Sequence, residues 1–527
     1  MTGGLSLITS AAFINAELAA EFGQLPPCFL PFGHHRLFVP QAASLARAGD
    51  RMVVTLPRSF TPGPWDLNRL RESGAEVLFV PDGLNLGESV RYALSLLDAR
   101  GPLRILHGDT LFLDPLPDQP DAVGVATTQD AYAWGAVDAA GHFVNRRPTR
   151  DARGDNVLTG WFSFSSAPAF LRALTLSDDD FLGALDIYGA EHTLLYREIG
   201  GWLDFGHLQT FHRARARAST ARSFNAITVS NRSVLKTGEK PDKLGAEADW
   251  FEGVPAPLRL HTPAFLGREG GGYRIGYEFS PTLHELFVFG ALEPAAWRQI
   301  LEGCFDFLGA CHALGATEGA AVVPDALNDL ALNKTGHRLE SWAAAAGVGL
   351  DEEWSHAGRR LPSLRRIAAE AARMAAATAP IPGVMHGDLC FPNAFFDFRQ
   401  RLVKVIDPRG SVRDGEHTVF GDLRYDLAKL NHSVEGYDLI LTGRYALEGA
   451  GTRDLTLTLS REGAGAFLPA IAAEFALEGQ RVSDPGIAAL TVHLFLSMLP
   501  LHADRPDRQQ AFLANALRLY AALEDAA

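Results

Sequence analysis

Residues 51–109 alternate short apolar runs with amphipathic runs, and this alternation limits the folds open to the chain. The runs RMVVTLP, AEVLFVP and LRILHGD have the length and the apolar character of buried strands. Between them, DLNRLRESG and LGESVRYALSLLDA space their apolar residues as one face of a helix does. Strands that alternate with helices in this way form a parallel sheet covered by helices. The sequence therefore predicts an α/β domain here.

Asp109 comes directly after the third of these predicted strands. In parallel sheets, ligands bind beyond the carboxyl ends of the strands, so an acid at this position is a candidate metal ligand. Aspartate is also common as a turn or cap residue, and its position alone leaves both roles open.

Four segments occur in the order LPPCFLPFGHHRLFVPQAASLA, ILHGDT, NVLTGWFSF and GGWLDFGHLQTFHRARA. In this order they resemble the sugar-nucleotide nucleotidyltransferases over most of the first 215 residues. The resemblance implies a Rossmann-like, GT-A-like domain with a parallel or mixed sheet. It also implies that Asp109 and Asp204 hold Mg²⁺ on the phosphates of a nucleoside triphosphate, CTP, UTP or GTP, and that Gly87 lets the backbone approach the base. Carboxylate oxygens suit a hard divalent cation.

Two features depart from that family's pattern. The glycine-rich loop that opens the family is absent, since LSLITSAAFINAELAAEFGQ contains only Gly23, and Pro27 stands where a lysine is expected. Arg36 and the two histidines before it are alternative sources of positive charge, and packing roles stay open for them. These departures leave two alternatives for the domain: a non-catalytic sensor of nucleotides or sugar nucleotides, and a glycosyltransferase-like domain.

A second constellation begins at SVLK, a predicted strand that ends on Lys236, and continues in KLGAEADWFEG, a predicted helix that carries Glu247. A lysine fixed by a helix glutamate directs its ammonium at nucleotide phosphates, although a lone Lys and Glu at this separation are most often a surface pair. YRIGYEFSPTLHEL then predicts a strand that turns into a loop at Tyr277 and Glu278.

The run VMHGDLCFPNAFFDFRQRLVKVIDPRG holds an acid, an amide and a second acid between apolar segments. In-line phosphoryl transfer needs a carboxylate that orients the acceptor hydroxyl and accepts its proton. It also needs oxygen ligands for the magnesium that bridges the phosphates. Asp388 suits the first role, and Asn393 together with Asp407, at the end of an apolar strand, suits the second.

The segments HGDLCFPNAFFD, VKVIDPRG and GDLRYDLAKL resemble the aminoglycoside phosphotransferase and choline kinase family, and the likeness extends from about Phe224 to the C-terminus. It implies a bilobal, protein-kinase-like α+β fold that binds ATP and Mg²⁺. Lys236 then contacts ATP with Glu247 behind it, and Tyr277 and Glu278 lie at the hinge that receives the adenine. Because no GxGxxG precedes Lys236, a choice of ATP over GTP does not follow from the sequence.

At 527 residues the chain exceeds what one hydrophobic core usually organises. The basic run FHRARARASTARSF lies where the first resemblance ends. We therefore predict a nucleotidyltransferase-like domain over residues 1–215 and a kinase-like domain over residues 216–527. Within the second, the N-lobe spans about 222–290 and the C-lobe about 291–527.

Composition excludes several other classes of protein. A net charge of −14 argues against nucleic acid or an anionic membrane as the main partner. The first residues lack the basic region of a signal peptide, and no run approaches the ~20 apolar residues that a membrane helix needs. The four cysteines form no CxxC pair, so they suggest neither disulfides nor a zinc site. A cytoplasmic protein without membrane insertion is predicted, and its oligomeric state stays open.

The two resemblances together predict a bifunctional enzyme. It phosphorylates a sugar or polar alcohol with ATP and then activates the product as a nucleoside diphosphate derivative, a pairing typical of capsule or cell-envelope glycan synthesis. The acceptor is left open among sugars, amino sugars, choline and other small alcohols. The alternatives named above for the first domain remain beside this prediction.

Overall fold

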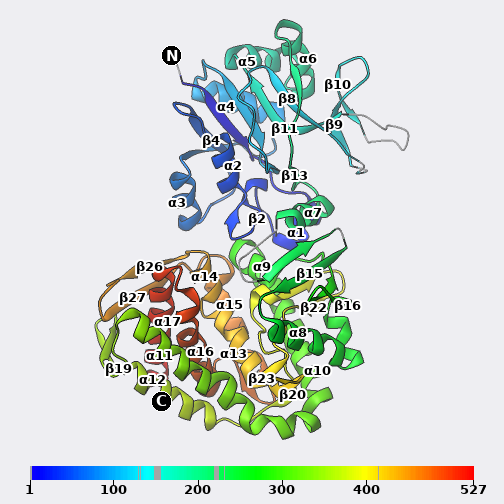
Figure 1. Cartoon of the computed structure of the whole chain (residues 1–527). Helices are drawn as coiled ribbons and strands as arrows, with labels where there is room; N and C mark the ends of the chain where they lie inside the picture. Colours follow the sequence, from blue (N-terminus) through cyan, green and yellow to red (C-terminus); the bar gives the residue numbers. More distant parts are fainter. Residues whose placement is uncertain are drawn as a thin grey trace. The chain divides into compact units, whose positions relative to one another are not determined.

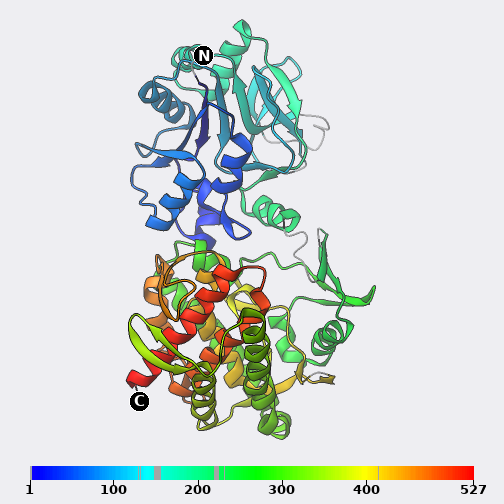
Figure 2. The ribbon, with the colours of Figure 1, turned by 60° about the vertical axis from the view of Figure 1, so that its left-hand side comes forward.

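The computed structural model describes residues 3–128, 130, 132–146, 156–218, 225–230, 232–413 and 415–526. The chain divides into two compact units, Met1–Ala218 and Ser219–Ala527 (Figures 1 and 2). Separate hydrophobic cores lie in the two units, as the length of the chain requires.

The first unit is built on a mixed sheet with the strand order β10-β9-β11-β6-β1-β4-β5, and β8 and β12 extend it beside β11. β1 pairs in parallel with β4 and β6, and β4 pairs in parallel with β5. The predicted parallel core is therefore confirmed, and β11 adds an antiparallel neighbour to β6. The strands are β1 (Leu5–Thr9), β2 (Pro31–Phe32), β3 (His35–Arg36), β4 (Arg51–Pro57), β5 (Ala75–Val80), β6 (Leu103–His107), β7 (Thr110–Phe112), β8 (Ala122–Thr127), β9 (Trp134–Val137), β10 (Phe143–Arg146), β11 (Asn156–Phe164), β12 (Leu195–Glu198) and β13 (Trp202–Asp204).

Helices surround this sheet (Figure 1). The Asn85 side chain accepts from the backbone N–H of Glu88, and Glu88 accepts from the backbone of Asn85, so a capping box starts α4. The buried side chains Val90, Ala93 and Leu94 then place one face of α4 in the core. The helices are α1 (Ala16–Phe22), η1 (Pro27–Phe29), α2 (Phe38–Leu45), α3 (Pro64–Glu72), α4 (Leu86–Leu97), α5 (Ala167–Leu176), α6 (Phe181–Glu191) and α7 (Leu208–Ala218).

The second unit opens with an antiparallel sheet in the order β14-β15-β17-β16. Its strands are β14 (Asn225–Val229), β15 (Ser233–Gly238), β16 (Phe265–Glu269) and β17 (Gly272–Gly276), and α8 (Pro241–Gly253) packs against it. The predicted strand over SVLK is longer than expected. Lys236 lies inside it and not at its end, because pairing with β14 extends to Gly238.

The remainder of the second unit is mostly helical. Its helices are α9 (Leu283–Phe289), α10 (Pro294–Leu327), α11 (Lys334–Ala346), α12 (Leu364–Ala376), α13 (Leu423–Val434), α14 (Tyr437–Leu441), α15 (Ala464–Ala472), α16 (Pro485–Met498) and α17 (Pro506–Ala526), with the short turns η2 (Ala256–His261), η3 (Asn328–Asn333), η4 (Phe391–Asn393) and η5 (Leu499–His502). Short hairpins and bridging strands are β18 (Glu353–His356), β19 (Arg359–Ser363), β20 (Pro382–Val384), β21 (Ala394–Asp397), β22 (Leu402–Val405), β23 (Ser411–Arg413), β24 (Glu416–His417), β25 (Phe420–Asp422), β26 (Tyr445–Glu448), β27 (Asp454–Leu459), β28 (Ala476–Leu477) and β29 (Gln480–Arg481).

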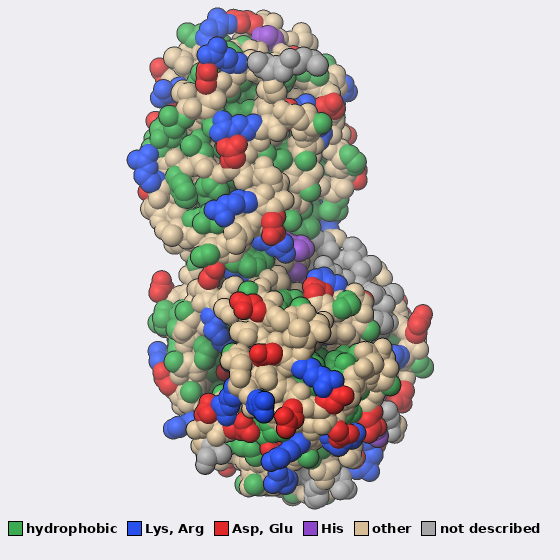
Figure 3. All heavy atoms as spheres, turned by 90° about the vertical axis from the view of Figure 1, so that its left-hand side faces the viewer, with side chains coloured by type: hydrophobic (Ala, Val, Ile, Leu, Met, Phe, Trp, Pro, Cys, Tyr) green, Lys and Arg blue, Asp and Glu red, His purple; other side chains and the backbone are tan. Residues whose placement is uncertain are grey.

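One helical stretch of the described chain, Pro485–His502, is long and apolar enough to cross a membrane by length and composition, with a mean hydropathy of 1.4. It is 67 % buried inside the protein, and α16 within it packs against α12, α13 and α17. Packing at the centre of the helical core therefore explains why this stretch is apolar. On the face drawn in Figure 3, basic and acidic side chains are interspersed.

A buried ion pair fastens β3 to α3 in the first unit. The Arg36 guanidinium donates from Nε and Nη2 to Asp66 at 3.1 and 2.9 Å, and from Nη1 to the carbonyl of Phe29 at 2.8 Å. Arg36 and Asp66 are only 6 % and 4 % exposed. Arg36, for which the sequence left open both a source of positive charge and a packing role, is thus engaged within the protein.

We expect Asp66→Ala to lower the free energy of unfolding by about 3–5 kcal/mol, because it leaves the Arg36 guanidinium buried without its carboxylate. Glu76→Ala is the matched control, since its pair with Arg51 is about half exposed, and it is expected to change stability by no more than about 1 kcal/mol. Urea unfolding of the full chain, followed by tryptophan fluorescence, measures both. Equal losses from the two variants would contradict the role given to the buried pair.

Candidate functional sites

Strand pairing brings Asp109 and Asp204 together in the first unit. β7 and β13 are antiparallel, with Thr110 opposite Asp204, and the backbone N–H of Phe205 donates to the carbonyl of Asp109 at 2.8 Å. Asp109, which follows the end of β6, therefore lies beside Asp204, the last residue of β13. Two acids almost a hundred positions apart become neighbours at the edge that the sequence predicts.

The two carboxylates face the same point in space. A Cβ placed on Gly206 would lie 2.5 Å from Asp109 Oδ2 and 3.3 Å from Asp204 Oδ1, so glycine keeps this point open. Burial, and then the charge of Asp204, raise the pKa of Asp109 to about 6. Like charges held this close favour a cation between them.

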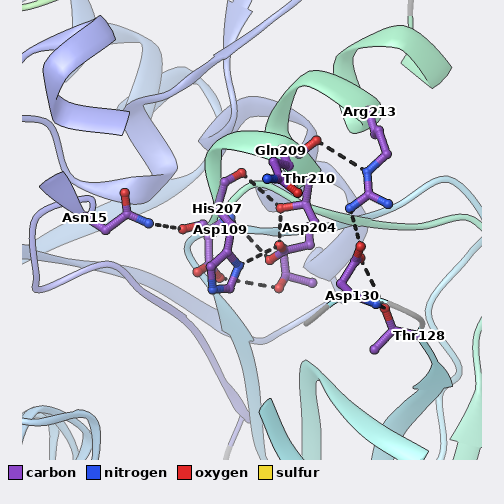
Figure 4. Close-up of polar contacts among 11 residues, drawn as sticks. Asn15, Asp109, Thr128, Asp130, Asp204, His207, Gln209, Thr210 and Arg213 are labelled. Atoms are coloured by element: carbon purple, nitrogen blue, oxygen red, sulfur yellow. Dashed lines mark hydrogen bonds and ion pairs between the residues drawn. The ribbon is translucent and has the colours of Figure 1, made fainter. Parts of the chain in front are cut away.

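Residues after β13 fix the orientation of Asp204 (Figure 4). His207 Nδ1 lies 3.1 Å from Asp204 Oδ2, and the Thr210 hydroxyl donates to the same oxygen. Burial lowers the pKa of His207, but the hydrogen bond to Asp204 and the charges of both acids outweigh it and raise that pKa above its usual value. Asn15 Nδ2 donates to the carbonyl of Gly206 at 2.8 Å and ties α1 to this loop.

These carboxylates fit magnesium better than a metal enclosed by protein ligands. Among the described residues, no group of three or more His, Cys, Asp or Glu side chains is arranged to hold a metal ion. Magnesium is usually held by one or two carboxylates and completes its shell with water and phosphate oxygens. Asp109 and Asp204 supply such a pair, and the remaining ligands would come from a bound nucleotide and water.

A cavity of about 510 Å³ opens beside the acids, and both Asp109 and Asp204 line it. Trp134, Trp202 and Thr159 also line it, and their indole nitrogens and hydroxyl have no hydrogen-bond partner among the described residues. Such unpaired polar groups favour a ligand that supplies partners. None of the described lining residues is a lysine or an arginine. Sequence reasoning did not single out either tryptophan as a site residue; Trp134 lies on β9 and Trp202 on β13.

Gly87 lines the same cavity, but the packing of its own chain already requires glycine there. A Cβ on Gly87 would lie 1.9 Å from the carbonyl oxygen of Asp179, in the loop before α6. The contact to the nucleotide base that the sequence suggests for Gly87 stays a prediction. The close approach of α4 to this loop is a sufficient physical reason for the residue.

We expect Gly87→Ala to lower the free energy of unfolding by about 1–3 kcal/mol, because the methyl group must push the Asp179 backbone away. Gly336→Ala, on the exposed side of α11, is the control: its Cβ meets nothing within 4 Å, and alanine there raises stability by about 0.5–1 kcal/mol. Chemical denaturation of both variants provides the comparison. A Gly87→Ala protein as stable as the parent would show that the two segments are not packed this closely.

In the second unit, Lys236 connects three elements. Its Nζ lies 2.7 Å from Glu247 Oε2 on α8 and 3.1 Å from Asp407 Oδ1 after β22. The Tyr273 hydroxyl on β17 donates to the same Glu247 oxygen at 2.8 Å. Burial lowers the pKa of Lys236, but the carboxylates of Asp407 and Glu247 outweigh burial and raise it above its usual value. The predicted lysine and glutamate are thus paired, and Asp407 joins them.

Asp388 lies on a loop that a buried acid holds in place. Asp426, on α13, accepts the backbone N–H groups of His386 at 2.8 Å and Gly387 at 2.7 Å. His386 Nε2 lies 3.0 Å from the carbonyl of Ile406, which braces the loop against β22. Burial raises the pKa of Asp426 to about 7 although the two backbone bonds oppose it. Asp426 therefore holds the loop of Asp388 in place through its backbone.

The Asp388 carboxylate contacts two side chains. Lys429 Nζ, also on α13, lies 2.8 Å from its Oδ1, and Asn393 Nδ2 donates to its Oδ2 at 3.1 Å. Burial raises the pKa of Asp388, but the ammonium of Lys429 outweighs burial and holds that pKa below its usual range. Sequence reasoning missed Lys429. Its spacing of three from Asp426 along one helix was the available signal.

Asn393 and Asp407 flank the hairpin of β21 and β22. The N–H of Ile406 donates to the carbonyl of Asn393 at 2.9 Å, so the residue before Asp407 is bonded directly to Asn393. Asn393 Oδ1 and Asp407 Oδ2 accept no hydrogen bond from the described residues. An amide oxygen and a carboxylate oxygen at one end of a hairpin suit magnesium.

The predicted hinge residues follow β17. Tyr277 N–H donates to the carbonyl of Arg232 at 2.9 Å, so the backbone there continues the pairing of β17 with β15. The carboxylate of Glu278 accepts hydrogen bonds from Lys404 Nζ and from the Ser280 hydroxyl, both at 2.9 Å. Its side chain is therefore engaged within the protein.

No family model and no curated protein matches the sequence. Among solved structures, the chain is similar to a nucleoside-diphosphate-sugar pyrophosphorylase from Vibrio cholerae, with 14 % identity, 40 % of this chain and 99 % of that chain covered, and a TM-score of 0.31. It is also similar to UTP-bound UGPase from Acinetobacter baumannii, with 14 % identity, 41 % of this chain and 93 % of that chain covered, and a TM-score of 0.31. A third similar structure is the inositol-1-phosphate CTP transferase from T. maritima, with 13 % identity, 42 % of this chain and 99 % of that chain covered, and a TM-score of 0.31. Likenesses this weak carry no argument about function.

Proposed function

We propose that the second unit is a kinase that transfers phosphate from ATP to a small molecule, and that the first unit is a nucleotidyltransferase acting on the product. One observation carries the proposal: the buried Lys236 ammonium lies between Glu247 and Asp407, at 2.7 and 3.1 Å. A lysine fixed by a helix glutamate beside a candidate metal ligand is suited to hold the phosphates of ATP.

The residues around Asp388 support the kinase step. Asp388 accepts a hydrogen bond from the acceptor hydroxyl and takes its proton as the oxygen attacks the γ-phosphorus. The bond from the γ-phosphorus to the β–γ bridging oxygen breaks, and ADP leaves. Because Lys429 keeps the pKa of Asp388 low, the carboxylate orients the hydroxyl early and receives the proton late. Asn393 and Asp407 would hold magnesium, which neutralises charge on the phosphates.

Asp109 and Asp204 support the nucleotidyltransferase assignment. Both line a cavity large enough for a small ligand, and they would hold the magnesium of a nucleoside triphosphate, CTP, UTP or GTP. The acceptor there is the phosphorylated sugar or alcohol, and the product is a nucleoside diphosphate derivative. Such derivatives are the activated units of capsule and cell-envelope glycans. This sequence of reactions suits an enzyme of the cytoplasm.

Two observations favour an alternative in which the first unit senses nucleotides or sugar nucleotides and regulates the kinase. The loop after β1 contains no glycine up to Gly23, and no described residue lining the cavity is a lysine or an arginine. A glycosyltransferase-like first unit is the other alternative. Release of pyrophosphate identifies a nucleotidyltransferase, release of a nucleoside diphosphate identifies a glycosyltransferase, and nucleotide binding without turnover identifies a sensor.

Asp388→Asn is expected to abolish ADP formation with an acceptor while MgATP binds as before, because Asp388 meets the acceptor and not the metal. Asp407→Ala is expected to weaken MgATP binding, because it removes a metal ligand. Thermal shift with MgATP and an assay of ADP release test both variants. Lost nucleotide affinity with surviving turnover in Asp388→Asn would show that its role is misassigned.

Asp109→Ala is expected to lower nucleotidyl transfer about 10²-fold or more, because one carboxylate fewer neutralises the triphosphate through magnesium. The phosphorylated intermediate then accumulates at an unchanged rate, since the kinase has its own metal ligands. Mass spectrometry of the products measures both effects, and Asp118→Ala, at a 73 % exposed acid outside the cavity, is the control. An unchanged product spectrum in Asp109→Ala would exclude a nucleotidyltransferase here.

A further inference from the structure

Cations from three elements gather beside Asp388. Lys334 and Arg338 are four positions apart on α11 and therefore share a face of that helix. Lys429 is bound to Asp388 at 2.8 Å from α13. The third element is the segment that follows β22, and it carries Arg409.

The backbone fixes Arg409 against the loop of Asp388. Its N–H donates to the carbonyl of His386 at 2.8 Å, and a Cβ on Gly387 would lie 2.7 Å from the Cβ of Arg409. Arg409 Nε donates to the carbonyl of Ser411 at 3.1 Å, so its stem is held while part of the guanidinium remains available. The backbone and Cβ of Arg409 thus contact the loop that carries Asp388, the candidate catalytic acid.

Lys334 is the unusual member of this group. Among the described residues its ammonium has neither a hydrogen-bond partner nor an ion-pair partner, although the side chain is partly buried. Burial, and then the charges of Arg409, Arg338 and Lys429, lower its pKa well below the usual value, and Asp388 is the carboxylate that opposes them. An unpaired ammonium among other cations is unfavourable unless an anion joins it.

The charges of this site do not balance within the chain. Arg338, Arg409 and Lys429 act together with Lys334 near the Asp388 carboxylate, which is already engaged by Lys429 and Asn393. The nearby Asp426 carboxylate is taken up by the backbone N–H groups of His386 and Gly387. Arg338 is held by a neutral group, since its Nη1 donates to the carbonyl of Ser497 at 3.1 Å. The excess is positive and lies beside Asp388, the residue that we assign to the acceptor hydroxyl.

We propose that the phosphoryl acceptor is itself an anion: a hydroxyl compound with a carboxylate or phosphate group that Lys334, Arg338 and Arg409 bind while its hydroxyl reaches Asp388. The inference rests on the proposed kinase function and names its substrate class. The transfer is the one described above: the acceptor oxygen bonds to the γ-phosphorus, its proton passes to Asp388, and ADP leaves. A neutral alcohol would bring no negative charge to balance these three side chains.

Matched pairs of acceptors test the inference on the full-length protein. Glycerate is compared with glycerol, gluconate with glucose, and glucose 6-phosphate with glucose, so that carboxylate and phosphate are separate arms. ADP release with MgATP gives kcat/KM, and thermal shift at saturating MgADP gives binding without turnover. We expect at least one anionic member to exceed its neutral partner at least tenfold in kcat/KM, or to stabilise the protein when the neutral partner does not.

Variants then locate the effect. Lys334→Met removes the charge and keeps the stem, and it is expected to raise KM for the preferred anionic acceptor at least tenfold with MgATP affinity within twofold of the parent. Lys334→Arg restores most of the affinity. Arg366→Met, at an exposed arginine on α12, is the control and is expected to change neither parameter.

Four outcomes overturn the inference. Anionic and neutral members that do not differ in turnover or in stabilisation exclude an anionic acceptor. If Lys334→Met loses MgATP affinity and keeps its KM for the acceptor, then Lys334 and its neighbouring cations bind the nucleotide and not the acceptor. If MgATP does not bind the parent protein, the proposed kinase function is rejected, and the inference with it. If the protein turns over only neutral alcohols in the presence of MgATP, the inference alone is rejected.

Discussion

The site of the second unit depends on one buried ammonium. Lys236 is 5 % exposed, and a buried charge is tolerated only when it is paired, so Glu247 on α8 and Asp407 after β22 must both reach β15. The Tyr273 hydroxyl supplies a further hydrogen bond to Glu247. This requirement fixes the helix, the sheet and the hairpin relative to one another, and the end of the hairpin then presents Asn393 and Asp407 together.

Charges that the chain leaves unbalanced are the common feature of the two candidate sites. In the first unit, Asp109 and Asp204 converge on the space kept open by Gly206, and burial with mutual repulsion raises the pKa of Asp109 to about 6. In the second, Lys334 is surrounded by cations and has no partner among the described residues. The first arrangement suits a cation, and the second suits an anion. Fully paired ions such as Arg36 and Asp66 serve stability instead.

Local patterns were sufficient for many elements. The strands over RMVVTLP and AEVLFVP, and the helices over DLNRLRESG and LGESVRYALSLLDA, lie where apolar spacing predicts them. Boundaries were less certain, because the strand that holds Lys236 continues to Gly238 through pairing with a strand outside the motif. Gly87 is required by the backbone of Asp179, a contact between distant segments that no local pattern contains.

By itself, the sequence determined the alternation of strands and helices in the first unit and the chemical types of the candidate groups, because periodicity and residue identity are local properties. It also indicated that Lys236 and Glu247 would be partners. Only the tertiary structure decided that Asp407 joins them, that Lys429 binds Asp388, and that Lys334 is left without a partner among the described residues. These outcomes depend on distances between segments far apart in the chain, which are set by packing and pairing and not by spacing along the sequence.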